Sequence, residues 1–389
     1  MSVVITSVVR TAVGTSRKGS LANTPPETLA ATVVREAIAR SAFAPDEIDD
    51  IVLAESLAGG GAIARHAAVE LGMLTVSGMA VNRHCAGGLS AIGVAAGAIL
   101  AGMENVVVAG GVNSGSMSPR MQMRNTATGE WEDWWIPPTH PDSAEAPNRD
   151  MSITVGWNTA KKAGLSREDM DAWAFRSHAR AVQAIDEGRF VDEIVPVLAR
   201  TPDGQTFEFK VDEHPRRGGS LEKLASLAVI HPEIEGFSIT AGNASGLNDA
   251  AAAMVLTSDT LARDKNANVV ATVLGWASLG IDPADMGLSV PGVVDKLLSR
   301  VGRSRKQIAL WEINEAFASV PLAACRIMHL DEDTVNISGS GCSLGHPIGA
   351  SGARMITTLA NDLKRRGGGL GIAAMCAGGG QAGAVLIEV

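Results

Sequence analysis

The chain has 389 residues, a formal net charge of -9 at pH 7 and 46% hydrophobic residues. This length predicts about two to three domains, and the hydrophobic content is typical of a well-buried globular protein rather than a disordered one. The acidic balance argues against nucleic-acid binding, which usually requires a basic face, so an anionic ligand would have to meet a local basic patch.

The cysteines and the two ends of the sequence indicate a reducing compartment. The four cysteines are Cys85, Cys325, Cys342 and Cys376, and none belongs to a Cys-x-x-Cys pair, so neither a metal site nor a disulfide framework is predicted. No apolar stretch approaches the roughly 20 residues that span a bilayer. No leader-like segment precedes the first predicted strand, and the last three residues are not a peroxisomal signal. We therefore expect a cytoplasmic protein.

Predicted strands and helices alternate in the first third of the chain. Val3 to Ile5 predicts a strand, and Glu47 to Glu55 predicts a helix end followed by a short buried strand. A strand-like run from Met79 to Val81 leads to a helical pattern from Leu89 to Leu100 and an apolar strand from Val106 to Gly111. This spacing favours βαβ units and a parallel sheet.

The middle of the chain, from about Gly115 to Thr240, differs in composition. Five of the seven tryptophans lie there, namely Trp131, Trp134, Trp135, Trp157 and Trp173, with Pro137, Pro138, Pro141 and Pro147 in a polar run. Ser166 to Asp169 matches a capping box and predicts a helix from Met170 to Ile185. The composition predicts an inserted loop domain on the ligand-facing side, and the alternative is a disordered linker.

The last part of the chain repeats the first. Lys306 to Glu315 repeats the pattern of Glu47 to Glu55, and His346 follows it at nearly the distance at which Cys85 follows the earlier segment. A helical pattern and an apolar strand then follow in both halves. In the second half they run from Ala350 to Leu363 and from Leu370 to Gly379. The repeat implies two similar domains whose strand ends converge on one site.

The first candidate for chemistry is Cys85, which follows a predicted strand and precedes a helix. The positive end of the helix dipole is expected to lower the pKa of its thiol. Gly87 and Gly88 would let a substrate carbonyl approach backbone N–H donors. Core packing is the alternative for a lone cysteine, but the residues before Cys85 are polar.

Two further candidates lie near the C-terminus. His346 precedes Pro347, a residue suited to the first turn of a helix. Its imidazole could activate Cys85 or donate to an oxyanion, with a capping role as the alternative. Cys376 precedes three glycines and could transfer a proton while Gly378 offers its N–H, with core packing as the alternative. Two cysteines and a histidine set among small residues indicate acyl transfer.

The remaining polar candidates are weaker. Asn314 and Glu315 lie at a predicted strand end, where Asn314 could hold a water molecule or a carbonyl. Cys325 lies on an apolar helical face and is expected in the core, whereas Cys342 is close enough in sequence to His346 to support it.

One basic patch interrupts the acidic sequence. The run from Pro215 to Ser220 contains Arg216 and Arg217, with Lys210 and Lys223 beside it. Phosphate groups would suit this patch, and a solvated surface run explains it equally well.

At these residues the chain resembles the thiolase family, and the resemblance covers nearly its whole length. The segments that resemble the family are Ser166 to Ala181, Thr240 to Asp249, Asn314 to Ala318, Gly345 to Gly352 and Cys376 to Gly380. The resemblance implies an α/β fold of two duplicated, thiolase-type βαβαβαββ halves in five layers, α-β-α-β-α, with an inserted loop domain. It also implies a dimer or a tetramer and no metal.

The expected domain boundaries follow from the resemblance. Residues 1–118 and 244–264 would form the N-terminal thiolase half, and residues 265–389 the C-terminal half. Residues 119–243 would form the loop domain, which carries the CoA and acyl-chain side.

The resemblance also implies a ping-pong reaction, in which a 3-ketoacyl-CoA and CoA give acetyl-CoA and a shortened acyl-CoA, or the reverse condensation. CoA would be a substrate rather than a bound cofactor. Cys85 would be the acylated nucleophile and Cys376 the acid/base that transfers a proton. His346 would activate Cys85 and, with a water held by Asn314, line one oxyanion hole. The backbone N–H groups of Cys85 and Gly378 would form the other.

Substrate contacts are implied at further positions. Ser245 and Arg216 match positions that contact the pantetheine and the nucleotide end of CoA. The acyl-pocket positions and their neighbour in the same motif are Met151, Met286, Phe317 and Ala316.

The sequence departs from the family pattern at positions that bear on the choice of acyl chain. The usual Cys-x-Ser-Gly becomes Cys85 to Gly88, and His84 takes a normally apolar place. The His-Met-Gly of short-chain thiolases becomes Asp150 to Ser152, within a Trp-rich and Pro-rich segment from Trp131 to Trp157. We expect acetoacetyl-CoA to be a poorer substrate than longer or branched 3-ketoacyl-CoAs, since each buried methylene contributes roughly 0.8 kcal/mol. The alternative is that the tryptophans leave room only for acetyl.

Two other interpretations stay open. A condensing enzyme of the ketoacyl synthase type would combine one cysteine with His/His or His/Asn, so the second cysteine, Cys376, favours a thiolase. A non-catalytic, acyl-CoA-binding subunit would be expected to lack Cys85, His346 or Cys376, and all three are present. Asn314 argues against the sterol-carrier type of thiolase.

Overall fold

The computed structural model describes residues 1–58, 61–134 and 138–389, so Trp135 and Pro137 of the predicted loop domain lie outside the described residues. The strands of the N-terminal half are β1 (Val3–Thr11), β3 (Asp50–Ala54), β4 (Ser77–Val81), β5 (Val106–Ser114) and β11 (Asn248–Ser258). Those of the C-terminal half are β12 (Ala271–Gly280), β13 (Ile308–Ile313), β14 (Leu370–Ala377) and β15 (Gln381–Glu388). All of them lie in one mixed sheet with the order β13-β14-β15-β12-β1-β11-β5-β3-β4.

The same strand order occurs in both halves, as the sequence repeat predicts. From the outer edge inward, the N-terminal half runs β4-β3-β5-β11-β1 and the C-terminal half runs β13-β14-β15-β12. Val335 forms a parallel bridge with Trp311 of β13, at the place that β4 takes in the other half. The halves join where Val3–Ile5 of β1 pairs antiparallel with Ala271–Val273 of β12. The predicted duplication is therefore confirmed.

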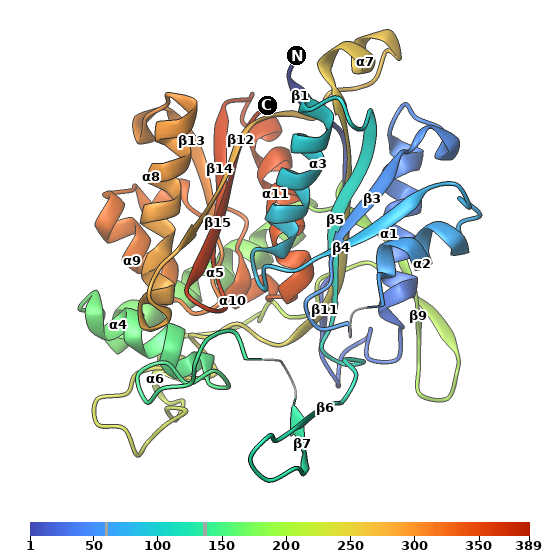
Figure 1. Ribbon diagram of the computed structural model, residues 1–389. Helices are drawn as coiled ribbons and strands as arrows, with labels where there is room; N and C mark the ends of the chain where they lie inside the picture. The colour runs from blue at the N-terminus through green and yellow to red at the C-terminus, as the bar shows by residue number, and fades with distance from the viewer. Residues whose placement is uncertain (59–60, 135–137) are drawn as a thin grey trace.

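Helices cover both faces of each half. The N-terminal half contributes α1 (Pro26–Arg40), α2 (Ile63–Glu70) and α3 (Gly87–Leu100), and the C-terminal half contributes α8 (Ser289–Val301), α9 (Ser319–Met328) and α11 (Ile348–Arg365). In Figure 1, α8 and α9 lie on one outer side, α1 and α2 on the other, and α3 and α11 in the middle. Leu89 and Ile92 of α3 share one buried cluster with Met355 and Ile356 of α11. The five predicted layers are thus present.

Glycines let the two central helices cross at close range. A Cβ at Gly88 would lie 2.7 Å from the backbone nitrogen of Ala353, and one at Gly352 would lie 2.4 Å from that of Leu89. Any larger side chain would push the helices apart, because real Cβ atoms do not approach backbone so closely. The crossing lies at the N-terminal ends of α3 and α11, next to the predicted reactive residues.

One expectation about these glycines is wrong. Gly87 and Gly88 do not serve substrate approach, since a Cβ at Gly87 would meet the Cβ of Ala54 at 2.8 Å and Gly88 faces α11. Both glycines are required by packing inside the fold.

The inserted stretch is folded, so the alternative of a disordered linker is wrong. Its elements are β6 (Met121–Arg124), β7 (Trp131–Trp134), a π-helical turn (Ser152–Trp157), α4 (Asn158–Lys162), α5 (Arg167–Asp186), β8 (Ile194–Val195), β9 (Val197–Arg200), β10 (Thr206–Phe209) and α6 (Leu221–Ala225). The predicted capping box is present, with Ser166 at the N-cap of α5 and Asp169 as its partner. Further short elements are β2 (Gly14–Thr15), α7 (Asp259–Asp264) and α10 (Gly341–Leu344).

A buried carboxylate fastens the inserted stretch to the C-terminal half. Glu315, at the end of β13, accepts hydrogen bonds from Trp173 Nε1 at 2.8 Å and Ser177 Oγ at 2.6 Å, both on α5. It also accepts from Asn336 Nδ2 and from the backbone N–H of Cys342. Helix α5 is therefore held in place beside the C-terminal strand ends. No helix among the described residues is both long and apolar enough to cross a lipid bilayer.

Candidate active site

The predicted reactive residues meet around one cavity of about 210 Å³. Cys85, His346 and Gly378 line it, together with the predicted substrate contacts Met151, Ser245, Met286, Ala316 and Phe317. The other lining residues are His84, Thr139, Asn148, Arg149, Val155, Gly246, Leu247 and Ile348. The cavity is therefore formed by both halves of the fold and by the inserted stretch.

Cys85 lies between β4 and α3. Its Sγ accepts hydrogen bonds from the backbone N–H groups of Gly378 and of Cys85 itself, which lower the pKa of the thiol, but burial outweighs them and raises this pKa to about 11. The predicted lowering by the helix dipole is wrong, because desolvation of the thiolate is the larger effect. The thiol is protonated at neutral pH and needs a base to become a nucleophile.

His346 is held by two hydrogen bonds just before the start of α11. Its backbone N–H donates to Asn248 Oδ1 at 2.9 Å, and its Nδ1 lies 2.6 Å from Ser351 Oγ. Since the Ser351 hydroxyl donates to the carbonyl of Pro347 at 2.9 Å, the hydrogen between Ser351 and His346 belongs to Nδ1. The Nε2 atom is then the unprotonated nitrogen, and it is buried without a hydrogen-bond partner among the described residues.

Burial keeps this imidazole neutral. It lowers the pKa of His346 to about 3, and the nearby guanidinium of Arg354 adds to the effect. A neutral imidazole with a free Nε2 lone pair is the form that accepts a proton.

Asn314 lies at the end of β13, fully buried, with its Nδ2 3.4 Å from His346 Nδ1. Its Oδ1 atom has no hydrogen-bond partner among the described residues. A buried amide oxygen without a partner is suited to hold a polar ligand or a water molecule, so the predicted role of Asn314 stays a prediction.

The three other cysteines are buried, each in a different part of the fold. Cys376 is 1% exposed, and burial together with the neighbouring Cys85 raises the pKa of its thiol. It stands next to Cys85 without lining the cavity wall. Cys325 belongs to the core around α9, as predicted. Cys342 is buried near Glu315, and its Sγ points toward backbone carbonyls.

Two residues that position His346 were missed by the sequence reasoning. Ser351 lies in the first turns of α11, and Asn248 is the first residue of β11. Ser351 follows His346 by little more than one helical turn, so its side chain and the imidazole can meet. Asn248 lies in the family-like segment from Thr240 to Asp249, but nothing local predicts its contact with His346, because the two residues meet only through the tertiary fold.

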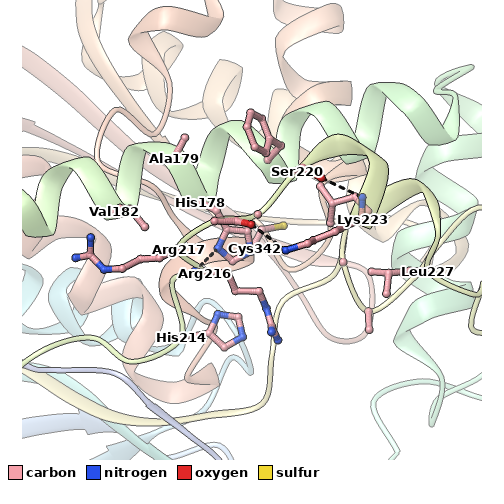
Figure 2. A pocket seen from close by; sticks show the side chains of 16 residues that line it. His178, Ala179, Val182, His214, Arg216, Arg217, Ser220, Lys223, Leu227 and Cys342 are labelled. Carbon is pink, nitrogen blue, oxygen red and sulfur yellow. Dashed lines mark hydrogen bonds between the residues drawn. The ribbon is translucent and has the colours of Figure 1, made fainter.

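Arg216 lines a different, larger cavity of about 470 Å³, shown in Figure 2. Its wall includes His178 of α5, His214, Arg217 and Lys223. The backbone N–H of Arg216 donates to His178 Nδ1 at 3.2 Å. In the described part of the chain the guanidinium of Arg216 has no hydrogen-bond partner, and it lies below α5 in Figure 2.

The basic patch is smaller than its sequence suggests. Lys210 pairs with Glu208 on β10 at 2.5 Å and does not line the cavity. Arg217 pairs with Asp186 at 2.6 Å on the surface. Burial, followed by the charges of its cationic neighbours, lowers the pKa of His178 to about 4. Arg216 and Lys223 are thus the cations that remain for a ligand in this cavity.

The two cavities adjoin at one glycine. Gly246 lines the smaller cavity, and a Cβ there would lie 2.6 Å from Nε2 of His214, which lines the larger one. Ser245 beside it donates its backbone N–H to the carbonyl of Ala316 at 2.9 Å. The two cavities are therefore neighbours, with Gly246 and His214 packed against each other between them. No group of three or more His, Cys, Asp or Glu side chains that could hold a metal ion occurs among the described residues.

Comparison with known families and proteins agrees with this arrangement. Residues 3–260 match the family model of the thiolase N-terminal domain, and residues 267–389 match that of the thiolase C-terminal domain.

Curated relatives are similar over their whole length. An acetyl-CoA acetyltransferase of Pseudomonas aeruginosa is 38% identical, with 97% of each chain covered. A cytosolic acetyl-CoA acetyltransferase of Mus musculus is 36% identical over 99% of this chain and 98% of the relative. Among solved structures, the acetyl-CoA acetyltransferase of Bacillus anthracis aligns with a TM-score of 0.89 and 37% identity, covering 100% of this chain and 98% of the other.

Proposed function

Because the chain belongs to the thiolase family, we propose that it transfers acyl groups between CoA thioesters through an acyl-enzyme on Cys85. It is an acyltransferase, as its relatives are by name. The observation that carries the proposal is the meeting of three groups at one cavity: the Cys85 thiol, the N–H of Gly378 and the Nε2 of His346, which no described residue hydrogen-bonds.

In the degradative direction, His346 takes the proton of Cys85, and the sulfur attacks the 3-keto carbon of a 3-ketoacyl-CoA. The bond between that carbon and the acetyl-CoA portion then breaks, and Cys376 gives its proton to the departing carbon. In the second half-reaction Cys376 takes the proton of a CoA thiol, whose sulfur attacks the acyl group on Cys85. A shortened acyl-CoA leaves, the released sulfur of Cys85 takes its proton back from His346, and the reverse sequence is the condensation.

Two oxyanion holes support these steps. The N–H groups of Cys85 and Gly378 already point at Sγ, so they are suited to an oxygen on the carbon bound to Cys85. Once His346 has taken the proton of Cys85, its Nε2–H and a water held by Asn314 form the second hole. Donors fixed in a buried site stabilise developing charge more than solvent does.

CoA itself extends through both cavities. Arg216 and Lys223 meet phosphate groups of the nucleotide end in the larger cavity, and the pantetheine passes Ser245 and Gly246. CoA is a substrate in this scheme.

The acyl pocket accepts chains larger than acetyl. Met151, Met286 and Phe317, which line the cavity of about 210 Å³ at Cys85, offer apolar surface to such a chain. Asp150, which stands where short-chain thiolases have a histidine, is engaged by His231 Nε2 at 2.7 Å and by Ser152. A thiolysis series over acyl length tests this, and the highest kcat/KM on acetoacetyl-CoA would contradict it.

The proposal includes a homo-oligomer in the cytoplasm. Strand β4 is the edge of the main sheet, and Met79 on it is 40% exposed. An exposed edge strand with an apolar side chain favours pairing with a second copy. The cytoplasmic location is supported by the cytosolic relatives and by four free thiols.

Initial-rate kinetics of thiolysis with 3-ketohexanoyl-CoA and CoA test the reaction. Parallel double-reciprocal lines are expected, since the first product leaves before CoA reacts. Cys85→Ser should lower turnover by several orders of magnitude because an alkoxide forms far less readily than a thiolate. Cys325→Ser is the matched control, and equal losses in both variants would refute the role of Cys85.

A further inference from the structure

The imidazole of His84 lies in the wall of the acyl pocket and has no role in the proposed reaction. His84 immediately precedes Cys85 and lines the cavity beside Gly378. A Cβ at Gly378 would lie 3.1 Å from Cγ of the His84 ring, so the ring packs directly on the backbone whose N–H points at Cys85.

The backbone fixes His84 in place. Its φ of 45° lies in the left-handed region, which histidine tolerates better than most side chains do. Its N–H donates to Asn82 Oδ1 at 2.8 Å, and its carbonyl accepts from Ser56 Oγ at 3.1 Å. The imidazole therefore occupies a defined position relative to an acyl group on Cys85.

The ring nitrogens of His84 have no hydrogen-bond partner among the described residues, and Nδ1 is fully buried. A buried polar atom without a partner is unfavourable, and a ligand that supplies the missing hydrogen bond is one explanation for it. The family resemblance places an apolar side chain at this position, so the histidine is a feature of this chain.

Neighbouring polar side chains in the wall do not supply the missing partner. Asn148 Oδ1 accepts from the backbone N–H of Thr139 at 2.9 Å and from its hydroxyl at 3.1 Å. The Asn148 amide donates to the carbonyl of His140. These groups satisfy one another, so they shape the pocket while His84 keeps its hydrogen-bonding capacity.

We propose that His84 hydrogen-bonds an uncharged oxygen on the acyl chain, so that the preferred substrate is a 3-ketoacyl-CoA with a hydroxyl or carbonyl group beyond the keto carbon. This inference rests on the proposed acyl transfer and names its substrate class. A site with a buried polar group discriminates strongly against the analogue that lacks the matching group, because the site's own atom is then left unpaired.

The oxygen is uncharged for two reasons. Burial lowers the pKa of His84, so the ring is neutral at pH 7 and offers a hydrogen bond without a charge. Met151, Met286 and Phe317 contribute apolar surface to the same wall, which Arg149 also lines, and against apolar surface a carboxylate loses more hydration than a hydroxyl does.

Thiolysis of two matched substrates tests the inference in the wild-type protein. 5-Hydroxy-3-ketohexanoyl-CoA and 3-ketohexanoyl-CoA have the same carbon chain and differ by one oxygen. We expect kcat/KM to be at least about tenfold higher for the hydroxylated substrate, as one satisfied buried hydrogen bond implies. His84→Leu should remove this preference, and His84→Gln, which keeps a hydrogen-bonding group, should restore part of it.

Controls separate the competing explanations. His66→Leu replaces an exposed histidine of α2, paired with Glu70, and should keep the wild-type ratio. Equal kcat/KM for the two substrates in the wild type, or an unchanged ratio in His84→Leu, overturns the inference. 3-Ketoadipyl-CoA carries a carboxylate at the end of its chain. A higher kcat/KM for it than for the hydroxylated substrate overturns the inference that the preferred oxygen is uncharged.

The same experiment distinguishes failure of this inference from failure of the proposed function. If the wild type cleaves 3-ketohexanoyl-CoA and its Cys85 becomes acylated, acyl transfer stands and only the role of His84 is at stake. If no substrate is cleaved and no adduct forms, the proposed function fails and the inference fails with it.

Discussion

The hydroxyl of Ser351 decides which nitrogen of His346 can act as a base. It accepts from Nδ1 at 2.6 Å while donating to Pro347, so Nε2 keeps its lone pair on the side of the cavity. Ser351→Ala removes this acceptor and leaves a buried N–H unpaired, at a penalty of about 1–3 kcal/mol. We expect kcat to fall about 10–100-fold with a smaller change in KM.

Steady-state kinetics with a thermal-unfolding control check this prediction. A Ser351→Ala protein with wild-type kcat would show that Asn314 or the packing alone orients the imidazole. A loss confined to thermal stability would assign Ser351 to the fold.

The protonation state of Cys85 is a second property at the residue scale. With a pKa of about 11, the thiolate fraction at neutral pH is small and grows steadily as the pH rises. Alkylation of Cys85 by iodoacetamide should therefore accelerate over the whole range from about pH 7 to pH 10. Peptide mapping after timed alkylation measures it, and a plateau below pH 8 would indicate a thiolate stabilised by α3.

Among the elements, the crossing of α3 and α11 brings the two halves of the site together. Gly352 faces the backbone of Leu89, where a Cβ would be 2.4 Å from the nitrogen. Gly352→Ala should destabilise the protein by about 1–3 kcal/mol and lower activity, because Cys85 and His346 lie next to the crossing. Gly97→Ala in α3 is the matched control: a Cβ there meets nothing within 4 Å, and the change should stabilise the helix by roughly 0.5–1 kcal/mol.

Chemical denaturation of both variants separates local helix propensity from packing. If Gly352→Ala and Gly97→Ala changed the free energy of unfolding equally, the close approach of α3 and α11 would not contribute to stability.

Whether an element could be predicted from the sequence depends on how far apart in the sequence its interacting residues lie. The capping box at Ser166, the helix from Leu89 and the repeat around Glu315 are local patterns, and local geometry determines them. Two other features join segments that are distant in the sequence, so no local pattern predicts them. They are the pairing of β1 with β12 and the contact of Asn248 with His346. The pKa of Cys85 depends on how completely the fold buries the thiol, which is why the dipole argument alone gave the wrong sign.

The edge strand β4 lies next to the active site and is also the expected contact between subunits. It leads directly into the loop that carries His84 and Cys85, and Met79 is exposed on it. We expect the wild type to be a homo-oligomer by light scattering, and Met79→Asp to shift it toward a monomer because a charge on an edge opposes strand pairing. The matched control is Met103→Asp, since Met103 is exposed beyond the end of α3. A monomeric wild type, or equal effects of both changes, would contradict an interface at β4.

At the scale of the whole molecule, the two halves and the inserted stretch converge on one thiol, that of Cys85. The most direct test incubates the protein with acetyl-CoA alone and maps the acetyl group by mass spectrometry of its peptides, in the wild type and in Cys376→Ser. Acetyl on Cys85 is expected in both proteins, with its transfer to added CoA slowed about 10²–10⁴-fold in Cys376→Ser, the usual contribution of a general acid/base. Acetyl on Cys376 or Cys342 with none on Cys85 would contradict the account.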